Sequence, residues 1–470
     1  MTAVKNNRDN YIFKRKDLVK IILPLIFQQL LTVMVGAVDT MMVAYAGESA
    51  VSGVSLVNTL DVLLMLFFTS LVAGGSVVVA QTLGEKRYED ARHASKQLIY
   101  VTTAMAIVVA IIGFVLRQSL LNLLYGDVEP SVMLSAENYF FIIVFSYPFI
   151  AIESAVVALF RASGNSLVSL IVSLAMNLLN VCGNAFFIIV LGMGAGGAAL
   201  STLIVRVLGA GITLALFHRK KGELYIEKLL RYKPDWTVIR KILRIGVPNG
   251  IENAMFHFGK LLTQSLISAM GTASIAANAV ALTVSNFQYT VGTAFSSATI
   301  TIVGQSVGAR EEGQAKYYAK LMTALNYLAL WAVIALTLVF VSPVIALYGL
   351  SEQAAITAKE LIIYHCVCAG LVWPVAFMLP SAFRAASDVK FPLVVSMVTM
   401  WVFRVAGSYV CALETVSVFG LFTIPGFNLG VMGVWVAMTV DWLFRTIFFL
   451  IRFGSGAWLK QSYNLPKENK

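Results

Sequence analysis

The chain has 470 residues, of which 59% are hydrophobic and only 13% are charged, and its formal net charge is +11. Soluble domains carry about 25% charged residues, so this composition excludes an ordinary soluble fold. The positive charge alone would suit a nucleic-acid partner, but most of it lies in loops between long apolar segments. The composition is therefore that of an integral membrane protein.

Twelve apolar segments are long enough to cross a membrane as helices, since one span needs about 20 apolar residues. In chain order we predict the spans at 17–45, 51–80, 97–116, 134–160, 166–191, 195–218, 237–270, 275–305, 320–348, 355–383, 391–413 and 430–453. The polar stretch 218–236 separates the first six spans from the last six. We therefore predict an all-α membrane protein with an N-lobe at 1–218, a cytoplasmic linker at 219–236 and a C-lobe at 237–470.

The positive charges predict the orientation of these spans. When both termini are placed in the cytoplasm, only Arg117 and Lys359 fall in outer loops, and Arg206, Lys260 and Arg404 lie inside spans. The other lysines and arginines are then cytoplasmic, which is the positive-inside bias of membrane proteins. We therefore predict a multi-pass protein with both termini in the cytoplasm and no nucleic-acid partner.

The two halves of the chain repeat one another. The segment "VAQTLGEKRYEDARHASK" is answered by "VGQSVGAREEGQAKYYAK", so that Gln81 and Gly84 recur 224 positions later as Gln305 and Gly308. Each half has six spans and therefore enters the membrane in the same direction, which predicts a pseudo-symmetry axis along the membrane normal. We expect two pseudo-symmetric six-helix lobes with a central cleft.

Each half begins with a span that carries a proline in its first third, at Pro24 and at Pro248. Proline removes a backbone hydrogen bond and favours a bend in the helix. Such a bend is either a fixed kink or a hinge that moves during function. Both interpretations remain open, and we carry the hinge forward as a hypothesis.

Ionisable and amide side chains inside the first-half spans indicate a functional site, because such groups are costly in lipid. Asp39 is the only charge in "LLTVMVGAVDTMMVAYAG". It is either a carboxylate that exchanges a proton or binds sodium, or the partner of Arg206 in a structural ion pair. Amide and hydroxyl groups that suit a small cation or a proton with waters occur in the fifth and sixth spans, at Asn177, Asn180, Asn184 and Thr202.

The second half carries different charges at the matching positions. Asp39 becomes Thr263, and Asn180 becomes Arg404. Glu252 and Lys260 share one helix face but lie about 12 Å apart along the axis, so they cannot pair directly, and Arg404 is a candidate partner for Glu252. Either these charges bind a substrate or they stiffen the lobe. The candidate cleft residues of both halves are Gln28, Asn177, Glu252, Phe256, His257, Lys260 and Arg404.

Several sequence motifs of catalysis are absent. The sequence contains no GxxxxGK[ST] phosphate-binding loop, no HExxH metal motif and no GxSxG nucleophile elbow. We therefore expect no enzymatic activity, no cofactor, no resident metal other than a sodium ion at Asp39, and no use of ATP. A coupling ion, either H⁺ or Na⁺, would then supply the energy.

At these residues the chain resembles the multidrug and toxic compound extrusion (MATE) transporters of bacteria. The resemblance rests on the doubled loops "VAQTLGEKR"/"VGQSVGARE" and "FRASGN"/"FRAASD", on Pro24 followed by Asp39, and on "NVCGN … GAALST". It implies a V-shaped, two-lobed fold and the antiport of small organic molecules by alternating access, from a bacterial cytoplasmic membrane and as a monomer. It also implies a coupling site that comprises Asp39, Asn180, Asn184 and Thr202, lined by Tyr139.

The chain departs from that pattern in its second half. The tenth span, "CVCAGLVWPVAFMLPSAF", has no acid, which argues against a second sodium site. Lys260 and Arg404 argue against a pocket for cationic drugs there and favour an anionic or zwitterionic cargo. A flippase for a lipid-linked sugar or another polar metabolite is the nearest alternative function, and a channel is a more distant one. In every case we expect membrane lipid around the helices and a small molecule as substrate.

Overall fold

The computed structural model describes residues 11–126, 128–219, 222–227, 233–418 and 422–463, and these are almost entirely helical. Every one of the twelve predicted spans coincides with a helix, because each apolar run is bounded by short polar or glycine-containing turns. Ten helical segments in the described part of the chain have both the length and the apolarity of a membrane span. The two long helices of the seventh and eighth spans are more polar.

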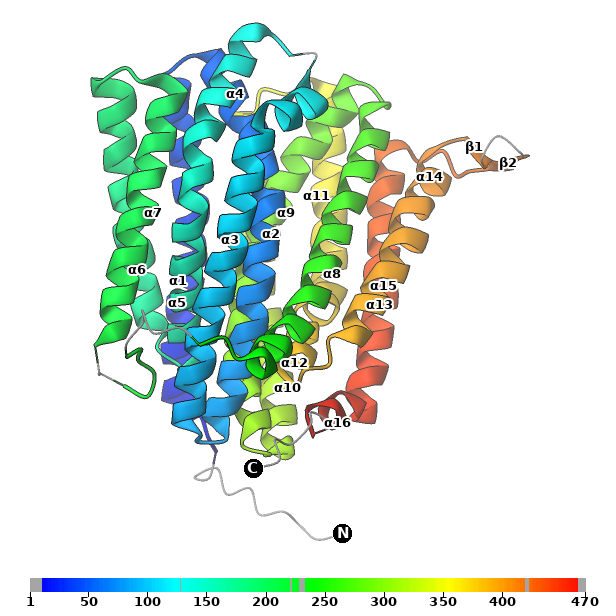
Figure 1. The fold of residues 1–470 in the computed structure, drawn as a ribbon. Helices are drawn as coiled ribbons and strands as arrows, with labels where there is room; N and C mark the ends of the chain where they lie inside the picture. Colours follow the sequence, from blue (N-terminus) through cyan, green and yellow to red (C-terminus); the bar gives the residue numbers. More distant parts are fainter. Residues whose placement is uncertain (1–10, 127, 220–221, 228–232, 419–421, 464–470) are drawn as a thin grey trace. The chain divides into compact units, whose positions relative to one another are not determined.

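The chain forms two compact units, Met1–Gly250 with Ile300–Ala315, and Ile251–Thr299 with Lys316–Lys470. The helices of the first six spans belong to unit 1, where α1 lies beside α6 and α2 beside α3 (Figure 1). A short 3₁₀ turn joins α4 to α5 within one span. The bounds are α1 (Arg15–Ala44), α2 (Glu48–Gly84), α3 (Tyr88–Tyr125), α4 (Pro130–Ile143), α5 (Tyr147–Ala162), α6 (Ser166–Asn184) and α7 (Gly194–His218).

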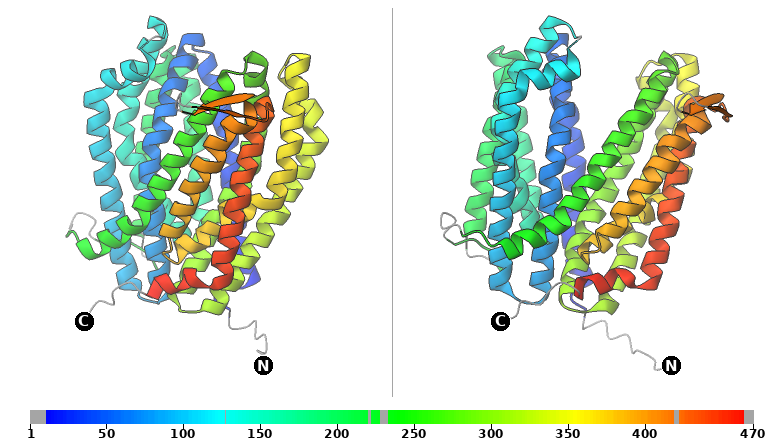
Figure 2. Two further views of the ribbon diagram at one scale, coloured as in Figure 1. Left: turned by 90° about the vertical axis from the view of Figure 1, so that its right-hand side faces the viewer. Right: turned by 45° about the vertical axis from the view of Figure 1, so that its right-hand side comes forward.

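Two long helices, α8 and α9, contribute to both units, and the remaining elements belong to unit 2. Within unit 2, α14 packs beside α15, and the antiparallel strands β1 and β2 form a hairpin that projects from the helices (Figure 2). The bounds are α8 (Trp236–Ser268), α9 (Thr272–Gly308), α10 (Glu312–Leu347), α11 (Glu352–Trp373), α12 (Leu379–Ala385), α13 (Lys390–Thr399), α14 (Gly407–Ala412), β1 (Thr415–Val418), β2 (Phe422–Pro425), α15 (Gly430–Ser455) and α16 (Ala457–Tyr463).

The internal repeat extends to the backbone angles of the turns. Gly47 ends the turn between α1 and α2 with a φ of 99°, and Gly271, 224 residues later, does the same between α8 and α9 with a φ of 92°. Lys86 and Arg310, also 224 residues apart, both have a φ of 60°. A positive φ is unstrained in glycine and uncommon in other residues, so its recurrence at Lys86 and Arg310 is a specific likeness between the two turns. The two halves of the sequence therefore specify the same turns as well as the same spans.

The helices α2 and α9 approach each other closely within unit 1, at residues that are equivalent in the repeat. A Cβ atom added at Gly304 would lie 3.0 Å from the Cβ of Ala80, its counterpart 224 positions earlier. A Cβ at Gly84 would overlap the carbonyl oxygen of Gln305, and a Cβ at Gly308 would overlap that of Gln81. These reciprocal contacts place a local two-fold pseudo-axis between the ends of α2 and α9.

Candidate functional site

The first polar site lies in unit 1 and joins side chains from α1, α6 and α7. Asp39 is half-buried on α1, and the Asn184 amide on α6 donates to its Oδ1 atom at 3.0 Å. Asn180, one turn earlier on α6, lies 3.3 Å from the same Asn184 nitrogen. Thr202 on α7 completes the group, since its hydroxyl oxygen lies 3.4 Å from the Asn180 side chain. The fold thus brings together four predicted residues that are far apart in the sequence.

The orientation of the Asn180 amide determines which protonation state of Asp39 this cluster fits. One terminal atom of the Asn180 amide lies 2.9 Å from Asp39 Oδ1 and 3.2 Å from Oδ2. If that atom is nitrogen, it donates to an ionised carboxylate. If it is oxygen, the contact is favourable only when Asp39 carries a proton, because two acceptors repel each other. A half-turn of one amide therefore adapts the cluster to either state of the carboxyl group.

Tyr139 lies near this cluster but does not bond to Asp39. Its side chain is only 6% exposed on α4, and its hydroxyl donates to Asn58 Oδ1 on α2 at 3.4 Å. Next to it, the buried Asp61 of α2 accepts a hydrogen bond from Tyr147. Only the fold could reveal the contacts of these tyrosines, because α2, α4 and α5 meet in space and not in sequence.

Arg206 is not the partner of Asp39. Its Nη1 atom donates to the hydroxyl of Ser146, and no Asp39–Arg206 ion pair occurs within 4.0 Å among the residues that the structure describes. The structural ion pair that was the alternative for Asp39 is therefore not formed.

The predicted hinge residues lie on α1 and α8, and the remaining cleft candidates of unit 1 lie on α1 and α6. Pro24 is inside α1, and Pro248 is inside α8, so each proline interrupts a long membrane helix. Gln28 donates from Nε2 to Ser173 Oγ on α6 at 3.0 Å, while its Oε1 atom is buried without a partner. Asn177 is half-buried and forms no hydrogen bond with another described residue.

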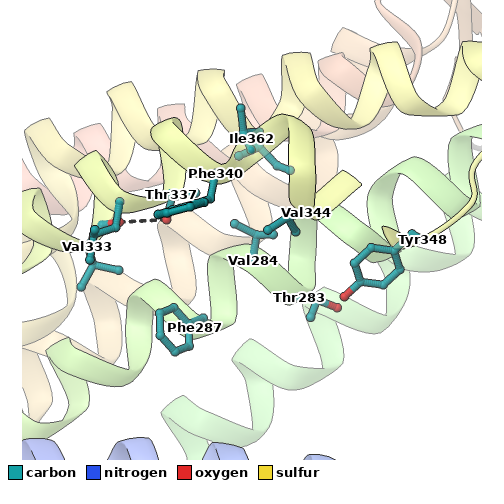
Figure 3. Close-up of a pocket in the computed structure, with 11 residues that line it drawn as sticks. Thr283, Val284, Phe287, Val333, Thr337, Phe340, Val344, Tyr348 and Ile362 are labelled. Atoms are coloured by element: carbon teal, nitrogen blue, oxygen red, sulfur yellow. Dashed lines mark hydrogen bonds between the residues drawn. The ribbon is translucent and has the colours of Figure 1, made fainter. Parts of the chain in front are cut away.

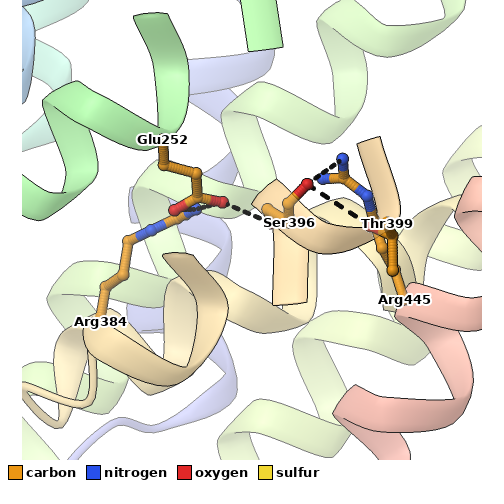
Figure 4. A network of polar contacts seen from close by, with 5 residues as sticks. All are labelled: Glu252, Arg384, Ser396, Thr399 and Arg445. Carbon is orange, nitrogen blue, oxygen red and sulfur yellow. Dashed lines mark hydrogen bonds and ion pairs between the residues drawn. The ribbon is translucent and has the colours of Figure 1, made fainter. Parts of the chain in front are cut away.

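The second polar site lies in unit 2, around Glu252 on α8. Arg384 Nη2 lies 3.0 Å from both carboxylate oxygens of Glu252, and Ser396 Oγ donates to Glu252 Oε1 at 2.8 Å (Figure 4). Arg445 donates to the backbone carbonyl of Ser396 at 3.2 Å. The expectation that Arg404 pairs with Glu252 is wrong, because α12 carries Arg384 directly to that carboxylate.

The repeat contains the signal that would have found this contact. Gln28 and Glu252 are equivalent at a shift of 224, and Ser173 and Ser396 are equivalent at a shift of 223, which is the shift that relates "LFRASGN" to "AFRAASD". The Gln28–Ser173 and Glu252–Ser396 hydrogen bonds are therefore the same contact in two halves. The arginine in the second of these loops is Arg384, so the loop motif itself supplies the partner of Glu252.

Three cations of unit 2 surround the ring of Phe256 on α8. Lys260 Nζ lies 5.2 Å from the ring centroid, and the guanidinium carbons of Arg404 and Arg445 lie 5.3 Å and 5.5 Å from it. Arg445 is paired with Asp441 through a 2.7 Å contact. Lys260 and Arg404 have no acid within 4.0 Å in the described ranges, although both side chains lie inside membrane helices.

The two histidines of the predicted spans have different surroundings. His257 is half-buried next to the cluster of cations, and its ring meets the edge of Phe256 at 6.4 Å. His365 is fully buried on α11 among aromatic rings and accepts no hydrogen bond at either ring nitrogen. Its neighbours Tyr289, Trp435 and Trp442 lie at 5.4 to 5.6 Å between ring centroids. Only His257 is therefore close to the cation cluster and partly accessible.

A separate apolar groove of about 310 Å³ lies between α9 and α10 in unit 2 (Figure 3). Thr283 and Thr337 on its wall donate to carbonyls of their own helices, which leaves the Tyr348 hydroxyl as the remaining polar side-chain group among the lining residues. Phe340 and Tyr348 are exposed at its rim, on a surface that would face lipid. The groove suits an acyl chain of the bilayer and lacks the polar groups that orient a transported solute.

The arrangement contains no preformed metal cluster in the residues described. No group of three His, Cys, Asp or Glu side chains gathers in a way that would bind a transition metal. The Asp39 cluster offers one carboxylate with amide and hydroxyl oxygens, which are ligands for a hard cation or a proton with water. In chemical terms, unit 1 presents an acid with adaptable hydrogen-bond partners, and unit 2 presents cations next to an aromatic ring.

A doubled helical membrane fold with buried charges and no catalytic constellation defines a membrane transporter. The family model MatE matches residues 24–186 and again residues 248–410, which start at the two equivalent prolines. The chain therefore belongs to the MatE family of transporters and is not an enzyme. The fold of this family has twelve transmembrane helices in two lobes, and α8 and α9 are two of them despite their lower apolarity.

Several named proteins are similar to this chain over nearly its whole length. A probable multidrug resistance protein NorM of Thermotoga maritima is 24% identical, with 95% of this chain and 94% of the relative covered. An uncharacterised transporter YisQ of Bacillus subtilis is 25% identical, with 98% of each covered.

Solved structures share the fold at lower sequence identity. A MATE transporter in the bent conformation is 18% identical, with a TM-score of 0.82 and 96% and 97% of the two chains covered. A transporter from Pyrococcus furiosus, reported with a binding pocket of reverse polarity, is 18% identical, with a TM-score of 0.83 and 96% of each chain covered.

Proposed function

We propose that this chain is a secondary antiporter that exports small organic molecules in exchange for H⁺ or Na⁺, with the ion bound at Asp39. The observation that supports the proposal is the cluster of Asp39, Asn180, Asn184 and Thr202, which joins three membrane helices through one carboxylate. A carboxylate that can be neutralised inside the membrane is the usual means by which a carrier senses an ion gradient.

The proposed mechanism couples the charge of Asp39 to the shape of α1. When Asp39 is ionised, Asn180 and Asn184 both present N–H groups to it and hold α1 against α6. When an ion neutralises Asp39, the amide of Asn180 turns, this attraction weakens, and α1 bends at Pro24. MATE structures of the same fold have been described in a bent and in a straight conformation, which supports a change of helix shape in this proposal.

The charge of the cargo determines how much energy the membrane potential supplies. Moving one charge through 100 mV is worth about 2.3 kcal/mol, which is roughly a 45-fold concentration ratio. Exchanging one proton for one monovalent cation forfeits that contribution, whereas a neutral or anionic cargo retains it. The polarity of the cargo site therefore bears directly on how well the carrier can pump.

We propose the same topology that the charge distribution predicts. Both termini lie in the cytoplasm of a bacterial cell, the lobes are 1–218 and 237–470, and 219–236 links them as a monomer in the cytoplasmic membrane. The relatives named as multidrug resistance proteins support a broad range of small organic cargoes. Pro248 would then serve the second lobe as Pro24 serves the first.

A second candidate function is the export or flipping of a polar or anionic metabolite, including a lipid-linked sugar. The observation that favours it is the pair of membrane cations Lys260 and Arg404, which have no acid partner in the described part of the chain. The reverse polarity reported for the binding pocket of the Pyrococcus transporter, and the different function suggested for it, support this candidate. Exchange of labelled for unlabelled cargo would separate either carrier from a channel, because a channel shows no counterflow.

The coupling proposal is tested by substituting Asp39 with asparagine in proteoliposomes. We expect Asp39→Asn to abolish cargo movement driven by a proton or sodium gradient, because a neutral amide can neither take up and release a proton nor offer a negative charge to sodium. The matched control is Thr263→Val, which changes the repeat-equivalent residue of unit 2 and should leave coupling intact. Coupled transport at the normal rate in Asp39→Asn would exclude Asp39 from the mechanism.

A further inference from the structure

The interior of unit 2 holds more positive than negative charge. Glu252 is neutralised by Arg384 in a two-pronged contact, and Asp441 is neutralised by Arg445. Lys260 and Arg404 remain, and in the described residues neither has an acid within 4.0 Å. Arg404 is only 6% exposed, and its guanidinium donates to no described side chain.

The two leftover cations lie close to each other and to a single aromatic ring. Each lies just over 5 Å from the centroid of Phe256, so both positive charges meet the same ring. Asp441 is bound to Arg445 through its Oδ1 atom, its Oδ2 atom accepts no hydrogen bond, and no ion pair within 4.0 Å joins it to Arg404 among the described residues. Ring faces attract cations by about 0.5–2 kcal/mol, which is far less than the cost of holding two bare charges in lipid.

An uncompensated pair of buried cations is stable only if something else supplies the negative charge. A bound anion would accept hydrogen bonds from both the ammonium of Lys260 and the guanidinium of Arg404. Lys260 and Phe256 are half-buried and Arg404 is buried, so a solute would meet Lys260 and the ring of Phe256 first. A cationic solute, by contrast, would meet two like charges there, which is a strong discrimination against it.

We propose that Lys260 and Arg404 bind the oxyanion of a cargo, either a carboxylate or a phosphate, while the ring of Phe256 and the edge of His257 pack against its apolar body. The guanidinium of Arg404 gives a planar pair of donors that matches such an oxyanion, and Lys260 adds a point charge. This inference rests on the proposed export function, because it names the substrate class of that carrier.

The test measures thermal stabilisation of the purified full-length protein by three probes that share one ring. Benzoate is the anion, benzamide is the neutral analogue and benzamidine is the cation. A ligand that binds only the folded protein raises the unfolding temperature in proportion to its affinity. We expect benzoate to bind at least about tenfold more tightly than benzamide, the factor that one charge-assisted hydrogen bond supplies, and benzamidine to bind least.

Two variants and two controls locate the effect. Lys260→Met and Arg404→Gln should each weaken benzoate about tenfold or more, and Lys260→Arg should retain most of the affinity. Lys260→Met should fold at least as stably as the wild type, because it removes an unpaired buried charge. Lys359→Met changes an exposed lysine of the same unit and should have no effect. If Lys260→Met failed to fold, the comparison of Arg404→Gln with Arg404→Lys would decide the question.

Further arms distinguish a free acid from a lipid phosphate and separate this inference from the coupling mechanism. Glycerol 3-phosphate replaces benzoate as probe, and the protein is placed in phosphatidylcholine nanodiscs with or without phosphatidylglycerol. Loss of the benzoate effect only with phosphatidylglycerol identifies a lipid phosphate as the natural occupant, and its persistence identifies a soluble acid.

Asp39→Asn should bind benzoate normally although it loses coupling. The proposal is overturned if benzamidine stabilises as well as benzoate, or if both cation variants keep the full response.

Discussion

The two units carry different charges at equivalent positions. In unit 1, Gln28 is neutral and bonds to Ser173, and the coupling candidate Asp39 is surrounded by amides. In unit 2, the equivalent of Gln28 is Glu252, which holds Arg384, and the equivalent of Asn180 is the cation Arg404. The repeated backbone therefore supplies the positions, and a few residue differences place an acid among amides in one half and cations around an aromatic ring in the other.

The largest expected effect comes from making unit 2 resemble unit 1 at Glu252. Glu252→Gln leaves Arg384 without its carboxylate in the membrane interior, and breaking a buried pair by removing one partner costs roughly 3–5 kcal/mol. We expect a marked fall in the unfolding temperature in detergent, followed by tryptophan fluorescence. The double variant Glu252→Gln with Arg384→Gln should recover most of the loss. A single variant as stable as the wild type would show that Arg384 finds another partner.

The second effect tests the crossing of α2 and α9, where the two halves touch at equivalent residues. Gly308→Ala would drive a Cβ atom into the carbonyl oxygen of Gln81, and overpacking of this kind costs about 1–3 kcal/mol. Gly84→Ala, its repeat mate, should cost a similar amount. The control is Gly313→Ala on α10, where a Cβ meets nothing within 4 Å and alanine should stabilise the helix by up to about 1 kcal/mol.

Unequal losses for Gly84→Ala and Gly308→Ala would show that the local pseudo-symmetry is not shared by the packing energy. Equal losses would support it. Circular dichroism in the same detergent would confirm that each variant retains its helices, so that a shift in unfolding temperature reports packing alone.

Much of this fold could be predicted from the sequence, since lipid requires long apolar helices and the repeat fixes their pairing in order. The span ends agree with the helices at the turns 44–48 and 268–272, which Gly47 and Gly271 mark, whereas α3 (Tyr88–Tyr125) extends beyond the predicted span 97–116 at both ends. The cluster at Asp39 was predictable from the three amides on one face of α6 and from the family resemblance. The pairing of Glu252 was not predictable from the dominant repeat shift of 224. The loops at 159–165 and 382–388, and likewise Ser173 and Ser396, are related by a shift of 223.

The orphan charge of Lys260 was predictable from its position, but its surroundings were not. Sequence distance gives no measure of which ring or guanidinium meets a lysine across a helix bundle. Arg445 illustrates this limit, because it belongs by position to the predicted cytoplasmic end and yet lies 3% exposed against Phe256. Likewise, Tyr147 reaches Asp61 only because α5 packs against α2.

A smaller effect concerns the starts of α1 and α8, the first helices of the two repeats. Asp17 accepts a hydrogen bond from the backbone N–H of Lys14 at the start of α1, and Asp235 accepts one from the backbone N–H of Thr237 at 2.9 Å at the start of α8. Loss of such a cap costs about 1 kcal/mol. We expect Asp235→Ala to lower the unfolding temperature slightly, with Asp17→Ala as the matched variant.

The pH dependence of that cap has a definite sign. Burial raises the pKa of the Asp235 carboxyl, but hydrogen bonds from His93 and from the backbone N–H groups of Val238 and Thr237 outweigh it, so the pKa lies below its ordinary value. A lowered pKa stabilises the fold above the unfolded value of about 4, and this contribution is lost as the pH falls through the folded value. Asp235→Ala should therefore differ from the wild type at pH 7 and converge with it in acid. A difference that persists unchanged at pH 3 would point to the backbone of that turn as its source.

The smallest expected effect on stability is at Gln28. Its equivalent in unit 2 is Glu252, where the largest effect is expected. Gln28 contributes one hydrogen bond to Ser173, but its Oε1 atom is already buried without a partner. Gln28→Leu therefore removes an unsatisfied acceptor together with one bond of about 1 kcal/mol, and the apolar side chain recovers part of the loss by burial. We expect a change within about 0.5 kcal/mol, measured beside Glu252→Gln under the same conditions. The opposite result would be that Gln28→Leu lowers the stability as much as Glu252→Gln does. The two positions would then share a structural role in the helix contact, and charge would not explain the difference between the units. Only such a shared role would make a neutral amide as costly to lose as a paired carboxylate.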